Sequence, residues 1–127
     1  MTSEIQKRVV IKIGSSSLTS LSGDISRRKI ERITDQVAEL KDQGHEVVLV
    51  SSGAVAAGYR TLGFVSRPTS LPEKQAAASI GQGRLIETYS ELLSSHGYAA
   101  SQILITRSDF SDETRYNNVR NTINVLL

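Results

Sequence analysis

The stretch Arg8-Val-Val-Ile-Lys-Ile-Gly-Ser-Ser-Ser17 decides the fold of this chain. Its first part is a β-branched run that contains a single lysine, Lys12, and such a run is typical of a strand buried on both faces of a parallel sheet. Gly14 and the serines follow at the carboxyl end of the strand, where open α/β sheets bind ligands. Because lysine is rarely buried without a partner, the Lys12 ammonium is expected to face an anion. The stretch predicts a phosphate site; a lysine on an edge strand before an ordinary turn is the alternative.

A second apolar run, residues 46–50, leads into the turn Ser51-Ser52-Gly53-Ala54 and a segment of small residues. The order strand, turn, helix points the free N–H groups of that helix toward the crevice expected beside Lys12. Two such turns at neighbouring strand ends indicate two substrates. For a lone Ser-Gly pair, the simpler interpretation is that Ser52 only caps the helix.

Between these strands, the serine-rich residues 15–24, which include Gly23-Asp24, are predicted to form a loop or short hairpin, and periodicity then predicts a helix over residues 27–43. Four apolar residues recur at helical spacing along this segment, so one face of the helix must lie on the sheet. Ser26 is placed to cap the start of the helix, and Gly44 is placed to end it.

The sequence Ser70-Leu-Pro-Glu73 has the form of a capping box and opens a long helix that Gly97 ends. Gly81 and Gly83 lie inside this helix, where each disfavours helix by about 1 kcal/mol relative to alanine. They are expected to permit a kink or close packing on a neighbouring backbone.

Residues 99–106 are predicted to form a third strand, residues 107–110 its exit loop, and a last helix begins near Asp112. Strands then alternate with helices, which predicts a βαβαβα topology with right-handed crossovers and a parallel sheet. Three strands are few for such a sheet, so the chain is expected to be the first part of a larger domain.

Composition narrows the possible functions. The chain has 127 residues, enough for one domain with a sizeable core, and a formal net charge of only +2, so nucleic-acid binding is not indicated. It contains no cysteine, which excludes disulfides and thiolate metal sites. No apolar run approaches the roughly 20 residues that a membrane span needs. These features predict a soluble, cytoplasmic protein that does not bind membranes.

Together the motifs resemble the amino acid kinase family, and within it the branch that phosphorylates the γ-carboxylate of glutamate with ATP, the first step of proline biosynthesis. The resemblance covers nearly the whole chain, in the order expected for the family. It is carried by the segments at residues 9–18, 44–58, 74–82, 105–110 and 120–122. It implies a three-layer αβα sandwich with a parallel-type central sheet. Residues 1–127 would be the amino-terminal part of the kinase domain, without its nucleotide-binding half.

The resemblance also implies roles for single residues. Lys12 matches the family lysine that reaches the transferred phosphoryl group, and Gly14 and Ser15 match the turn beside the phosphates. Ser52 matches the serine that contacts glutamate, and Gly53 and Ala54 continue that turn. ATP, Mg²⁺ and a homo-oligomeric assembly are implied by the family, but no residue of this chain is assigned as a metal ligand.

Alternatives stay open at this point. Another family member acting on acetylglutamate, aspartate, carbamate or a nucleotide monophosphate is one, and a truncated module without catalytic activity is another. The isolated 127 residues are not expected to catalyse the reaction. His45 and His96 each lie beside a helix-ending glycine and are predicted to be solvated turn residues. No histidine is expected to act as a base, because a carboxylate is already a nucleophile.

Overall fold

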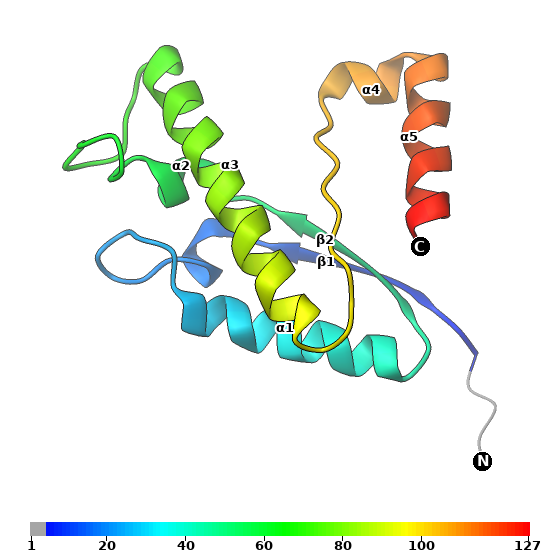
Figure 1. Cartoon of the computed structure of the whole chain (residues 1–127). Helices are drawn as coiled ribbons and strands as arrows, with labels where there is room; N and C mark the ends of the chain where they lie inside the picture. Colours follow the sequence, from blue (N-terminus) through cyan, green and yellow to red (C-terminus); the bar gives the residue numbers. More distant parts are fainter. Residues whose placement is uncertain (1–4) are drawn as a thin grey trace.

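The computed structural model describes residues 5–127 and contains two strands with helices around them (Figure 1). The α/β class with a parallel sheet and flanking helices is confirmed. In chain order the elements are β1 (Arg8–Ile13), the 3₁₀ turn Ser15–Ser17, α1 (Arg27–Asp42), β2 (Glu46–Ser51), α2 (Ala54–Gly58), α3 (Leu71–Ser94), α4 (Arg107–Ser111) and α5 (Glu113–Leu126).

Strands β1 and β2 pair in parallel, with Arg8 opposite Glu46 and Ile13 opposite Ser51. Burial alternates along β1, because only one face of the sheet is covered by the described residues. On the other face Val10 is 62% exposed and Val50 is 50% exposed. The prediction that this strand is buried on both faces is therefore wrong for residues 5–127. The apolar run does form a strand, but burial of its second face would need another layer of helices or strands on that side.

The core lies on the covered face, between the sheet, α1 and α3. Ile30 of α1 is completely buried there, and Leu85 and Tyr89 of α3 pack in the same cluster. The Ser26 side chain accepts a hydrogen bond from the Lys29 amide, and Gly44 has a φ of +90° just after the helix. The predicted start and end of this helix are confirmed.

Helices α2 and α3 touch through glycine. A Cβ added to Gly58 would lie 1.9 Å from the Ala77 carbonyl oxygen, and one added to Gly81 would lie 1.7 Å from the Ala54 carbonyl oxygen. Backbones can approach this closely only where no side chain intervenes. The predicted close packing is confirmed for Gly81, whereas a Cβ at Gly83 would meet nothing within 4 Å.

The carboxyl-terminal residues differ from the sequence-based expectation. Residues 99–106 are not a strand, because no strand among residues 5–127 hydrogen-bonds to them, so a β-forming sequence remains a connecting segment. The expected exit loop is instead the short helix α4, with the Asp109 carboxylate accepting a 2.6 Å hydrogen bond from the Thr106 amide. The last helix begins as predicted, with the Asp112 side chain accepting from the Arg115 amide at 3.0 Å.

The predicted loop or short hairpin is a hairpin, closed by an isolated antiparallel bridge between Thr19 and Ile25. Within the described part of the chain, no helix has the length and apolar character needed to cross a membrane.

Candidate functional site

The carboxyl ends of the two strands lie side by side, and Ser52 ties them together. Its amide and its hydroxyl each donate a 3.1 Å hydrogen bond to the carbonyl oxygen of Ile13, the last residue of β1. The N-cap position of α2 is occupied by Gly53, which offers no side chain for capping. The interpretation of Ser52 as a helix cap is therefore wrong, since its hydroxyl joins two strand ends.

The turn after β2 rests directly on the turn after β1. Gly53 has a φ of +99°, and a Cβ built there would lie 3.3 Å from both Cα and Cβ of Ser15 and 3.4 Å from Leu18. A side chain at this position would be strained by its backbone conformation and pressed against the neighbouring turn. Glycine thus allows the two turns to lie side by side, as the sequence predicts.

Lys12 lies opposite Val50 in the sheet, two residues before the first turn. Its side chain is exposed and belongs to the face of β1 that the core does not cover. Residues 5–127 contain four ion pairs, none of which involves Lys12. The ammonium is therefore accessible to an anion from solvent, next to exposed Gly14 and half-buried Ser15.

The second predicted set lies one turn away. Ser52 is exposed, and Gly53 and Ala54 are half-buried, with Ala54 as the first residue of α2. The structure therefore brings the six predicted site residues to one end of the sheet. An accessible ammonium, two glycine-containing turns and a serine hydroxyl in that arrangement can receive anionic groups on two adjoining surfaces.

Two residues that sequence reasoning did not select support these turns. The Lys29 ammonium donates to backbone carbonyls of the first turn, and the Tyr89 hydroxyl lies 3.2 Å from the Ser51 hydroxyl. Burial raises the pKa of Tyr89, and the hydrogen bond with Ser51 opposes that shift. The helical periodicity of α3 places Tyr89 in the core, but no sequence spacing links Lys29 to residues ten or more positions earlier.

The histidines have structural roles. His45 is buried, and its Nδ1 accepts a 3.1 Å hydrogen bond from the Lys7 amide, so the prediction of a solvated turn residue is wrong for it. His96 is exposed as predicted, and its Nε2 lies 2.9 Å from the Asp35 carboxylate. Neither contact involves a residue of the candidate site.

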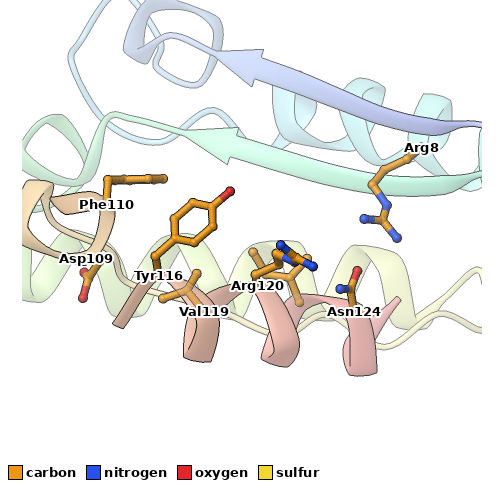
Figure 2. Close-up of a pocket in the computed structure, with 8 residues that line it drawn as sticks. Arg8, Asp109, Phe110, Tyr116, Val119, Arg120 and Asn124 are labelled. Carbon is orange, nitrogen blue, oxygen red and sulfur yellow. The ribbon is translucent and has the colours of Figure 1, made fainter. Parts of the chain in front are cut away.

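A separate hollow of about 230 Å³ lies where Arg8, at the start of β1, faces α4 and α5 (Figure 2). Asp109, Phe110 and Arg120, which come from two of the segments that carry the family resemblance, meet there. Figure 2 shows Tyr116 extending from α5 toward the strands. None of the six predicted site residues lines this hollow.

The fold and the site define an α/β protein with two adjoining turns at the carboxyl ends of parallel strands, the position in which open α/β sheets bind ligands. Residues 7–127 match the model of the amino acid kinase family. The chain belongs to this family, as its motifs suggested.

Similar proteins identify the branch of the family that this chain resembles. Glutamate 5-kinase 2 of Bacillus licheniformis is 72% identical over all 127 residues, which correspond to 34% of that protein. Glutamate 5-kinase 2 of Bacillus subtilis is 76% identical over 95% of the chain and 33% of that protein, and glutamate 5-kinase of Neisseria gonorrhoeae is 53% identical over 95% of the chain and 41% of that protein. The chain thus spans about a third of the length of two of these relatives and 41% of the third.

Proposed function

We propose that the chain is the amino-terminal part of the kinase domain of a glutamate 5-kinase, which transfers the γ-phosphoryl group of ATP to the γ-carboxylate of L-glutamate. The observation that carries the proposal is the contact between the two turns, made by the Ser52 hydrogen bonds to Ile13 and by Gly53 against Ser15. A phosphoryl donor and an acceptor must be held side by side for in-line transfer, and two adjoining anion-receptive turns meet that need.

Lys12 acts on the transferred group in this proposal. The carboxylate oxygen attacks the γ-phosphorus, a new O–P bond forms, and the bond to the ADP oxygen breaks. Negative charge spreads over the phosphoryl oxygens during transfer, so catalysis consists mostly of positioning and charge stabilisation. At about 4 Å and an effective dielectric of 20, one ammonium and one phosphate charge attract by roughly 4 kcal/mol. Gly14 and Ser15 provide the turn beside the phosphates.

Ser52, Gly53 and Ala54 receive glutamate in this proposal. The Ser52 hydroxyl donates its hydrogen to Ile13, which leaves its oxygen able to accept a hydrogen bond from the substrate ammonium. The exposed side of the turn admits a small charged molecule, whereas its buried side is fixed on β1.

The nucleotide itself needs more than these residues. Lys12 and the first turn fit a phosphate, but we assign them no contact with the adenine or the ribose. Within the part of the chain that the structure describes, no three His, Cys, Asp or Glu side chains gather as a metal cluster, so no residue here is assigned to Mg²⁺. The nucleotide-binding half is proposed to lie outside these 127 residues.

A substrate panel on the complete gene product tests the proposal. Glutamate-dependent ADP release is expected to exceed that with aspartate, acetylglutamate or carbamate by at least about a hundredfold in kcat/KM, because buried polar groups strongly reject ligands that leave them unpaired. Preference for another of these acids would assign the chain to a different branch, and no turnover with any of them would support a module without catalytic activity.

We also propose a cytoplasmic, homo-oligomeric protein. This proposal follows the family resemblance and not the exposed Val10 and Val50, which the rest of the kinase domain is expected to cover in the complete gene product. Sedimentation of the complete gene product tests this, and a monomer at tens of micromolar protein would contradict it.

A further inference from the structure

Lys29 projects from the first turn of α1 onto the serine turn that follows β1. Its Nζ donates to the Thr19 carbonyl oxygen at 2.6 Å and to the Ser16 carbonyl oxygen at 3.1 Å. An ammonium has three donors, and two of them bridge these carbonyls, which lie on either side of the end of the 3₁₀ turn. The contact therefore joins α1 to the turn that carries Gly14 and Ser15.

Two other carbonyl groups of this turn accept hydrogen bonds from within the turn. Gly14 accepts from the Ser17 amide at 3.1 Å, and Ser15 accepts from the Leu18 amide and the Thr19 hydroxyl, each at 3.0 Å. The Ser16 and Thr19 carbonyls instead accept from the charged Lys29 side chain. Carbonyl oxygens repel phosphate, so an ammonium placed on them both fixes the turn and offsets their negative charge.

The backbone of Lys29 is held in place, although its side chain is exposed. Its amide donates to the Ser26 side chain at the helix cap, and the next residue, Ile30, is completely buried in the core. The turn includes Ser15, which the proposed function places beside the phosphates. A displacement of this turn would therefore move the proposed phosphate contacts directly.

We propose that Lys29 is a positioning residue for the phosphate side of the site, holding the serine turn in the conformation that receives ATP. This inference rests on the proposed function and adds to it a residue that does not touch the reacting atoms. Its effect should be selective for the nucleotide, because the glutamate turn is held separately by Ser52 and Ser51.

Lys29→Met in the complete gene product should raise the KM for ATP about tenfold, while the KM for glutamate stays within about twofold, in line with the loss of charge-assisted hydrogen bonds at an exposed site. Lys29→Arg should restore most of the ATP affinity, because guanidinium can also bridge two carbonyls. Lys41→Met is the matched control: it removes one ammonium from the same helix, where Lys41 lies over the Tyr98 ring. It should leave both KM values unchanged.

Hydrogen exchange separates this inference from the proposed function. In Lys29→Met, amides of residues 16–20 should exchange about tenfold faster, while those of α3 keep their wild-type rates and so report an intact fold. Faster exchange in a gene product that does not phosphorylate glutamate would refute the proposed function and leave the positioning of the turn supported. Unchanged exchange at the turn, or an equal rise in both KM values, would overturn the role of Lys29.

Discussion

The segment from β1 to α3 and the segment from residue 99 to residue 127 differ in how much of their apolar surface is buried. Every residue of the buried core lies in the first, between Ile13 and Leu93, whereas α4 and α5 contain no buried residue. In the second segment Leu104 is 72% exposed and Val125 is 86% exposed. Figure 1 shows α4 and α5 standing apart from the pair formed by α1 and α3.

The contrast separates what local signals provide from what packing provides. The ends of α4 and α5 are set by Thr106, Asp109 and Asp112, all within a few residues of the helices they cap. Such caps contribute about 0.5 to 2 kcal/mol each and can define a helix without a core. A strand forms only where another strand can hydrogen-bond to it. β1 and β2 pair with each other, whereas residues 99–106 have no partner strand among the described residues and remain a connecting segment.

The largest expected difference is in stability, between matched substitutions in the two segments. Ile30→Ala should lower the free energy of unfolding by about 2 to 5 kcal/mol, because it empties a completely buried site. Ile123→Ala in α5 should cost less than about 1 kcal/mol, since that side chain is only half-buried. Urea unfolding of the chain followed by circular dichroism measures both. Similar losses in the two variants would show that the carboxyl-terminal helices pack as tightly as α1.

The second prediction concerns the exposed cation of the first segment. In the complete gene product, Lys12→Ala should lower kcat by on the order of a hundredfold or more, as expected for loss of one charge-stabilising donor. Arg120→Ala removes a cation from the hollow beside α5, where none of the proposed site residues lies. Its kcat should therefore stay within about threefold of the wild-type value. A Lys12→Ala variant with near wild-type kcat would remove Lys12 from the mechanism.

Sequence reasoning identified most of the first segment and less of the second. The strand from Val9 to Ile13 is marked by a continuous β-branched run, and the helices that begin after Ser26 and Ser70 are each marked by a capping residue in the sequence itself. Residues 99–106 carry the same apolar signal as a strand, but pairing depends on residues elsewhere in the chain. Local periodicity cannot report a missing partner.

The candidate site shows the same limit. Lys12, Gly14 and Ser52 could be selected because each lies within or directly after a strand that the sequence defines. The double hydrogen bond from Ser52 to Ile13 and the reach of Lys29 to Thr19 could not, because both join residues that only the folded chain brings together.

The third prediction uses the glycines of α3 as a matched pair. Gly81→Ala should destabilise the chain by about 1 to 3 kcal/mol or more, since its Cβ would overlap the Ala54 carbonyl and force α2 away. Gly83→Ala meets open space and should stabilise by up to about 1 kcal/mol through helix propensity. Urea midpoints of the two variants should therefore move in opposite directions. Stabilisation by both would show that α2 does not rest on α3 in solution.

The fourth prediction separates the two turns of the site. In the complete gene product, Ser52→Leu should raise the KM for glutamate by about tenfold or more and the KM for ATP by less than about threefold, because it removes a polar group proposed to contact only glutamate. Ser66→Leu is the control, because it makes the same substitution at an exposed serine in the loop between α2 and α3. It should leave both KM values unchanged. A larger rise for ATP would mean that the two turns have exchanged roles.

The smallest expected effect concerns Tyr89, which joins the core to the second turn through Ser51. Burial raises the pKa of Tyr89 above its usual value, so the folded state favours the protonated phenol. The stability linked to this proton is fully present below the ordinary tyrosine pKa of about 10 and is lost as pH rises through the raised pKa of the folded state. Tyr89→Phe removes the titration. At neutral pH it should cost about 0.5 to 1.5 kcal/mol, the net value of one hydrogen bond.

Urea unfolding at pH 7 and at pH 10.5 tests this sign. From pH 7 to pH 10.5 the free energy of unfolding should fall more for wild type than for Tyr89→Phe. The difference in stability between the two proteins should therefore be smaller at pH 10.5. Tyr116→Phe is the control, because Tyr116 is exposed and lies outside the core cluster, and this variant should lose as much stability as wild type. If the free energy of unfolding fell equally with pH for wild type and Tyr89→Phe, the Tyr89 phenol would not be buried in solution. The second turn would then not be held by the core through Tyr89 and Ser51.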